Sequence, residues 1–225
     1  MTRNDSRYTE PRLETSALIV IDMQRDFLDD AACPIPGTDA VVPRIVNLLT
    51  AFRDARRPIV HVVRIYREDG RNVDLCRRAL VEGGAKVVRP GDDGVEIASP
   101  LTRVRLDTDR LIAGELQPAG DREWIMYKPR WGAFFQTPLD AHLRSLGVST
   151  VVVAGCNFPN CPRTSIYEAS ERDYRAAIVT DAVSGIYERG LTELRNIGVA
   201  TLTTDEVCAN LATTSNSPGR LTGRF

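Results

Sequence analysis

The sequence lacks several features that would place it in a specialised class. No apolar run approaches the ~20 residues that a membrane-spanning helix needs, and residues 1–15 contain no apolar segment typical of a signal peptide. The 29 basic and 30 acidic residues nearly cancel, so nothing attracts the chain to nucleic acid or to anionic membranes. No internal repeat is visible. We therefore expect a soluble, cytoplasmic protein that binds neither nucleic acid nor membranes.

Cysteine and histidine are not arranged as disulfide frameworks or metal sites require. The five cysteines are odd in number and include no Cys-x-x-Cys pair. The only two histidines, His61 and His142, lie in separate segments, outside any cluster of metal ligands. We expect no metal and no cofactor, at least one free thiol, and a hydrogen-bonded core position for His61.

What the sequence does contain is the composition and patterning of one α/β domain. Its 225 residues, 43% hydrophobic and 26% charged, suffice for one domain with a sizeable core and are too few for two. Continuous aliphatic runs, typical of strands buried on both faces, occur at 16–22, 58–65, 124–128, 150–156 and 176–181, with a weaker one at 200–203. Helical patterns occupy 40–56, 137–146, 161–173 and 188–197. This alternation predicts parallel βαβ units.

Three segments fall outside this alternation. Residues 1–15 read as a polar N-terminal arm, and 206–225 as a C-terminal tail that is mobile or crosses to another subunit. Residues 67–122 are rich in charge, glycine and proline and contain only short patterns, such as a helical one at 75–81. Because this segment is too long for a simple connection, we interpret it as a lobe or lid beside a site, with surface decoration as the alternative.

Polar residues at strand ends are the first functional candidates, because ligands of parallel sheets bind at the carboxyl edge. Asp22 ends the first aliphatic run, Lys128 ends the run WIMYK, and Cys161 follows the run TVVVAGC. Pro162 suits the first turn of a helix, so Cys161 is placed at a helix start, where free amides and the helix dipole would lower the pKa of its thiol. The turn 155–160 could supply an oxyanion hole. A thiol, a carboxylate and an ammonium together suit nucleophilic catalysis.

Three blocks carry a family resemblance: ALIVIDMQRDFL, YKPRWGAFFQTPLDAHLRSLGVSTVVVAGC and NCPRTSIYEASERDYRAAIVTDAVSG. Together they resemble the isochorismatase-like cysteine hydrolase superfamily, which includes nicotinamidases and N-carbamoylsarcosine amidases. The resemblance covers most of 16–204. It implies a single-domain, three-layer α/β/α Rossmann-like fold over 16–205, with a six-stranded, mainly parallel sheet. It also implies a homodimer or homotetramer whose sites are lined partly by a neighbouring subunit.

The resemblance also implies roles for individual residues. Asp22 would be the general base, Lys128 its cationic partner and Cys161 the nucleophile. A cis peptide would join Cys156 to Asn157, with the backbone amides of Asn157 and Cys161 as oxyanion donors. The chain departs from the family pattern in the turn Asn157-Phe158-Pro159-Asn160, which makes the Phe158–Pro159 bond a second candidate for a cis peptide.

The implied reaction is hydrolysis of a small-molecule amide or carbamoyl C–N bond through a thioester. The Asp and two His of the nicotinamidase metal site have no counterpart here, and the retained cysteine favours amide hydrolysis over the vinyl ether hydrolysis of isochorismatases. Candidate substrate-binding residues are Phe27, Tyr66, Trp131, Phe158 and Arg163, and arginines such as Arg64 would suit a carboxylate on the substrate. The alternatives are a vinyl ether hydrolase, a non-catalytic metabolite-binding protein, and a redox-sensing thiol pair of Cys156 and Cys161.

Overall fold

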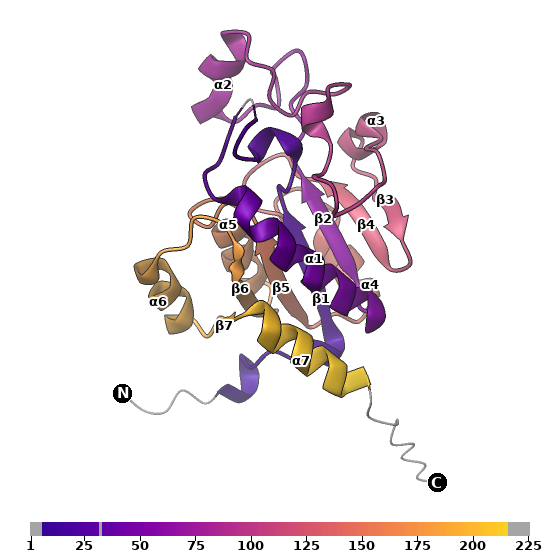
Figure 1. Cartoon of the computed structure of the whole chain (residues 1–225), viewed down its shortest axis with the longest axis vertical. Helices are drawn as coiled ribbons and strands as arrows, with labels where there is room; N and C mark the ends of the chain where they lie inside the picture. The colour runs from indigo at the N-terminus through magenta and orange to yellow at the C-terminus, as the bar shows by residue number, and fades with distance from the viewer. Residues whose placement is uncertain (1–5, 32, 216–225) are drawn as a thin grey trace.

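One seven-stranded sheet forms the centre of the protein, as a computed structural model that describes residues 6–31 and 33–215 shows (Figure 1). The strand order is β3-β4-β2-β1-β5-β6-β7. All neighbours pair in parallel except β3, which pairs antiparallel with β4. The strands are β1 (Ser16–Ile21), β2 (Ile59–Val63), β3 (Gln117–Gly120), β4 (Glu123–Tyr127), β5 (Thr150–Gly155), β6 (Arg175–Val183) and β7 (Ala200–Leu202).

The seventh strand corrects the expected six, while the fold class is confirmed. The additional strand, β3, has the sequence QPAG, which contains no β-branched or aromatic residue. Proline and glycine disfavour strands, and proline is accepted at a sheet edge because its missing N–H group is not needed there. The neighbouring strand β4, rather than the local sequence, therefore determines that this segment pairs.

Helices cover both faces of the sheet and complete the three layers. One apolar cluster joins one face to α1 and α7, and a second cluster joins the other face to α4, α5 and α6. The helices are α1 (Thr38–Asp54), α2 (Leu75–Glu82), α3 (Thr108–Ile112), α4 (Leu139–Ser145), α5 (Cys161–Ser170), α6 (Glu188–Asn196) and α7 (Thr204–Ser215). None of those seen within residues 6–215 is both long and apolar enough to cross a lipid bilayer.

The central strands follow directly from the aliphatic runs. Every residue of β1, β2 and β5 is buried, because helices cover both faces of the sheet there. In the order β4-β2-β1-β5 these four strands are parallel neighbours, so their carboxyl ends lie side by side at one edge. This edge therefore collects the residues that follow each strand.

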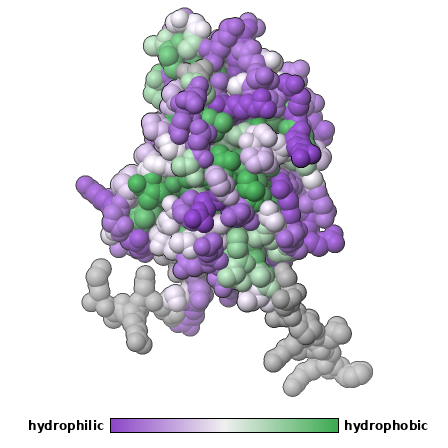
Figure 2. Space-filling model, in the orientation of Figure 1, coloured by the Kyte–Doolittle hydropathy of each residue, from purple (hydrophilic) through white to green (hydrophobic). Residues whose placement is uncertain are grey.

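The segment 67–122 contains α2, α3 and the edge strand β3, together with a cis Ser99–Pro100 bond. Figure 1 places α2 at one tip of the molecule and α7 near the other. Hydrophobic atoms are visible at the tip formed by α2 (Figure 2), where Leu75 is 81% exposed and Leu80 is exposed as well. The segment is thus a lobe with helices of its own, joined to the sheet through β3.

The described parts of the N-terminal arm and of the C-terminal tail contain regular structure. Residues 6–8 and 13–15 form short 3-10 turns, and the buried Leu13 packs into the core. Of the expected tail 206–225, residues up to 215 belong to α7, which packs on α1 through the buried Val207 and Leu211. Their spacing of four positions places both side chains on one face of a helix, and the prediction of a tail overlooked this pattern. Residues 1–5 and 216–225 lie outside the described residues.

Candidate active site

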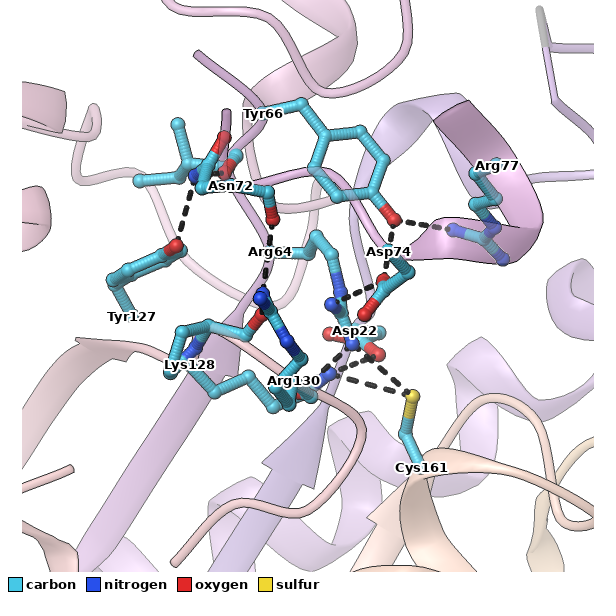
Figure 3. A network of polar contacts seen from close by, with 12 residues as sticks. Asp22, Arg64, Tyr66, Asn72, Asp74, Arg77, Tyr127, Lys128, Arg130 and Cys161 are labelled. Carbon is cyan, nitrogen blue, oxygen red and sulfur yellow. Dashed lines mark hydrogen bonds and ion pairs between the residues drawn. The ribbon is translucent and has the colours of Figure 1, made fainter. Parts of the chain in front are cut away.

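The structure brings Asp22, Lys128 and Cys161 together at the carboxyl edge of the sheet (Figure 3). Asp22 follows β1, Lys128 follows β4, and Cys161 is the first residue of α5, with Pro162 next to it in the first turn. The ammonium of Lys128 is fully buried and donates to Asp22 Oδ2 at 2.8 Å and to Cys161 Sγ at 3.3 Å. One cation therefore contacts both the carboxylate and the thiol.

The electrostatics of the thiol correct the expectation of a lowered pKa. Burial is the largest effect and raises the pKa of Cys161, and the negative charge of Asp22 raises it further. Lys128 and Arg64 act in the opposite direction but do not reverse the shift. Burial disfavours the charged thiolate more than the helix start favours it. The resting sulfur is therefore a thiol, and its use as a nucleophile requires a base.

Asp22 has an oxygen available for that proton. Its Oδ2 atom accepts from Lys128, whereas its buried Oδ1 atom has no hydrogen-bond partner among the described residues. A buried carboxylate oxygen without a donor is uncommon because the lost hydration is uncompensated. Asp22 thus combines a fixed position with an unused acceptor beside the thiol.

A second cation, Arg64, also approaches the sulfur. Its Nη2 atom lies 3.8 Å from Cys161 Sγ and donates to the carbonyl oxygen of Arg130 at 2.8 Å. Its Nη1 atom donates to Asp74 Oδ2 at 2.6 Å, and the hydroxyl of Tyr66 donates to the same oxygen at 2.8 Å (Figure 3). Asp74 is a site residue that sequence reasoning missed, because nothing in the lobe's local pattern shows which of its residues returns to the sheet.

The turn before α5 has the backbone arrangement that the resemblance implies. The peptide between Cys156 and Asn157 is cis, as predicted, and the alternative Phe158–Pro159 bond is not. The amides of Asn157 and Cys161 donate to no acceptor among the described residues. Asn160 Nδ2 donates to Asn157 Oδ1 within the same turn. Two unused backbone donors thus flank the nucleophile candidate.

A small pocket with a cavity volume of about 20 Å³ opens onto these groups. Two of the expected substrate-binding residues, the buried Phe27 and the partly exposed Trp131, line it. Its complete lining is Asp22, Phe27, Ile35, Arg64, Asp74, Arg77, Trp131, Cys156, Asn157, Asn160 and Cys161. Asp74 and Arg77 come from the segment 67–122, so that lobe lies beside the candidate site.

Three expected substrate-binding residues do not line the pocket. The ring of Phe158 is fully buried and packs edge-on against Tyr187 at 5.2 Å, because its side chain turns into the core beneath α6. Arg163, on α5, pairs with Glu193 and with the Tyr187 hydroxyl. Tyr66 lies behind the lining: its hydroxyl is hydrogen-bonded to Asp74 and Arg77, and the centre of its ring lies 5.8 Å from the guanidinium of Arg64.

Neither histidine belongs to the site. His61 Nε2 is hydrogen-bonded to Glu123 Oε1 at 2.7 Å and is buried, which confirms its predicted core position. His142 packs edge-on against Trp124. Within the part of the chain that the structure describes, no group of three or more His, Cys, Asp or Glu side chains is arranged to hold a metal ion.

Comparison with known proteins decides the family. The model of the isochorismatase domain matches residues 16–206. The chain belongs to the isochorismatase family. This confirms the resemblance seen in the three sequence blocks.

Relatives of this isochorismatase-family chain include amidohydrolases. A protein of Arabidopsis thaliana named probable inactive nicotinamidase is 31% identical over 209 residues, which cover 89% of this chain and 98% of that protein. The ureidoacrylate amidohydrolase of Methylobacterium radiotolerans is 27% identical over 209 residues, covering 84% and 74%. Among solved structures, an isochorismatase family protein of Desulfovibrio vulgaris is 33% identical, with a TM-score of 0.75 and coverage of 88% and 98%.

Proposed function

We propose that this protein is a cysteine-dependent hydrolase that cleaves a small-molecule amide or carbamoyl C–N bond. The observation that carries the proposal is the contact of one buried ammonium, Lys128, with both the Asp22 carboxylate and the Cys161 thiol at a pocket floor. The similarity to a ureidoacrylate amidohydrolase supports the amide class of substrate. Asp22, Lys128 and Cys161 are the proposed catalytic residues.

The first half of the reaction forms a thioester. Asp22 takes the thiol proton and the sulfur of Cys161 attacks the carbonyl carbon, while Lys128 stabilises the negative charge that forms at sulfur. The carbonyl oxygen becomes an oxyanion, which the free amides of Asn157 and Cys161 hold; one such donor contributes about 3 to 4 kcal/mol in other enzymes. Protonated Asp22 then gives its proton to the nitrogen, and ammonia or an amine leaves.

The second half hydrolyses the thioester. Asp22 accepts a proton from water, whose oxygen attacks the thioester carbonyl carbon. The C–S bond breaks, the acid product leaves, and the proton returns to sulfur. Both halves use the same base and the same oxyanion donors, so the arrangement around Cys161 serves the whole cycle.

Replacement of the nucleophile tests the proposal. Ammonia release from a panel of primary amides and ureido compounds should fall at least about 1,000-fold in Cys161→Ala, because no acyl-enzyme can form. Cys208→Ala is the matched control, because Cys208 lies on α7 and does not line the pocket; it should retain wild-type rates. Mass spectrometry of the wild type during turnover should find the acyl group on the peptide that contains Cys161.

The other outcomes separate the alternatives. Full activity of Cys161→Ala on an amide would show that the nucleophile is assigned wrongly. Hydrolysis of isochorismate at equal rates by the wild type and Cys161→Ala would favour a vinyl ether hydrolase. Binding without turnover of any panel member would favour a metabolite-binding protein.

A further inference from the structure

Arg77 is the one cation of the pocket lining that lacks an ion-pair partner among the described residues. Lys128, beneath the pocket, pairs with Asp22, and Arg64 pairs with Asp74. Among the described residues, the guanidinium of Arg77 donates to the hydroxyl of Tyr66 at 3.4 Å and lies over the ring of Phe27, 5.5 Å from its centre, and both groups are neutral. A guanidinium that lines a pocket without a counter-ion has N–H donors to offer to a ligand.

The charges around the pocket therefore do not balance. The carboxylates of Asp22 and Asp74 face three cations, Lys128, Arg64 and Arg77, while the buried thiol of Cys161 is neutral because its pKa is raised. One positive charge remains. A partly buried guanidinium without a counter-ion is costly, and an anionic ligand would neutralise it.

The position of Arg77 is fixed relative to the sulfur by a chain of contacts. From Arg77 the chain runs through the Tyr66 hydroxyl and the Asp74 carboxylate to Arg64 and then to Cys161 Sγ (Figure 3). Arg77 belongs to α2 of the lobe, so the lobe places this cation on the pocket wall. The remaining walls include Phe27, Ile35 and Trp131, which suit a short hydrocarbon linker.

We propose that the substrate carries a carboxylate, which Arg77 binds while the amide or carbamoyl carbon lies at Cys161. The guanidinium fork matches a carboxylate in shape and charge. This inference rests on the proposed hydrolase function, but the binding of a carboxylate can be measured without turnover. Arg77 is thus the residue that selects short amides or ureas with an acidic end.

Protection of Cys161 against iodoacetamide measures that binding. The probes are two matched pairs of similar length, succinamate with butyramide and N-carbamoylglycine with ethylurea, in which only the first member carries a carboxylate. We expect the carboxylate member to halve the alkylation rate at a concentration about 10- to 100-fold lower than its neutral partner, the range expected for one hydrogen-bonded charge pair.

Variants of Arg77 and of its neighbour Arg78 test whether Arg77 causes the preference for carboxylate probes. Arg77→Gln should abolish the preference for the carboxylate probes and leave protection by the neutral probes unchanged, and Arg77→Lys should restore part of the preference. Arg78→Gln is the matched control, since Arg78 is the next residue of α2 and does not line the pocket; it should behave as the wild type. Equal protection within each pair, an undiminished preference in Arg77→Gln, or no protection by any probe would overturn the proposal.

Ammonia release from the same four probes separates this inference from the proposed function. Release from the carboxylate members by the wild type, with a raised KM and a nearly unchanged kcat in Arg77→Gln, supports both. Carboxylate-selective protection without ammonia release from any amide contradicts the hydrolase and leaves the role of Arg77 standing. Equal turnover of both members of a pair supports the hydrolase and contradicts the role of Arg77.

Discussion

At the residue scale, the chemistry of the site depends on how burial and three charged neighbours set the state of one thiol. Burial and Asp22 raise the pKa of Cys161, while Lys128 and Arg64 lower it. The sulfur is thus protonated at rest but lies beside an unused carboxylate oxygen, Asp22 Oδ1. This arrangement favours proton transfer to Asp22 during attack over a preformed thiolate and ammonium pair.

Substitutions of Asp22 and of Lys128 should change the alkylation rate of Cys161 in opposite directions. Asp22→Asn removes an effect that raises the pKa of Cys161, so alkylation by iodoacetamide at neutral pH should become faster, because a larger fraction of the sulfur is then thiolate. Hydrolysis should be lost in the same variant, because the base is gone. Lys128→Met removes an effect that lowers the pKa and should slow alkylation.

Peptide mass spectrometry over a range of pH gives the rate at Cys161, with glutathione as the unburied reference thiol. The wild type should reach half of its maximal rate at a higher pH than glutathione does. Slower alkylation of Asp22→Asn than of the wild type at neutral pH would contradict the direction assigned to Asp22.

At the scale of elements, the sequence predicts the site wherever a buried strand ends in a polar residue. Asp22 and Lys128 follow strands whose aliphatic runs are unmistakable, and Pro162 marks the helix that begins at Cys161. Asp74 and Arg77 could not be found in this way, because they reach the pocket through the docking of α2. Docking depends on contacts distant in sequence, and no local periodicity records them.

One glycine allows the ends of β5 and β1 to approach each other closely. Gly155, at the end of β5, has φ +119°, and a Cβ atom there would lie 2.1 Å from the carbonyl oxygen of Ile21, the residue before Asp22. Gly155→Ala should therefore lower the free energy of unfolding by at least about 2 kcal/mol, because a strained φ and a backbone clash add together. The change also moves the strand end that carries Asp22, so activity should fall with stability.

Urea unfolding of two alanine variants checks the role of that contact. Gly147 also has a positive φ, of +70°, but a Cβ atom there would meet nothing within 4 Å. Gly147→Ala should therefore cost only the conformational strain and should leave activity intact. A loss in Gly155→Ala no larger than that in Gly147→Ala would show that the approach of β5 to Ile21 is not a tight constraint.

At the scale of the whole molecule, the sequence predicts the three layers better than the elements at their edges. The buried runs and amphipathic helices predict a three-layer α/β domain, whereas the edge strand β3 and the final turns of α7 depend on the elements that they pack against. The expected homodimer or homotetramer stays a prediction. The exposed Leu75 of α2, and Trp131 at the pocket, are the kind of apolar surface that a neighbouring subunit would cover.

A cluster of charged and polar side chains around the buried Glu123 links three elements of the domain and should affect its stability in acid. Glu123 of β4 accepts from Arg53 of α1 at 2.8 Å and is hydrogen-bonded to His61 of β2 at 2.7 Å. Burial alone would raise its pKa, but the bonds from His61 and Arg53 outweigh burial and lower it to about 2. A lowered folded-state pKa contributes stability above the unfolded value near 4.5, and that stability is lost as pH falls from 4.5 toward 2.

Glu123→Gln should therefore lose about 2 to 3 kcal/mol of unfolding free energy at pH 7, and its deficit relative to the wild type should shrink as pH falls from about 4.5 to 2. Urea unfolding at a series of pH values measures both curves. Glu188→Gln is the matched control, because the pKa of Glu188 is also lowered but its pair with Arg195 lies at the surface; its curve should follow that of the wild type. A deficit that persists unchanged at pH 2 would mean that Glu123 stabilises the fold through packing. The charge of Glu123 would then not stabilise the contacts of β4 with α1 and β2.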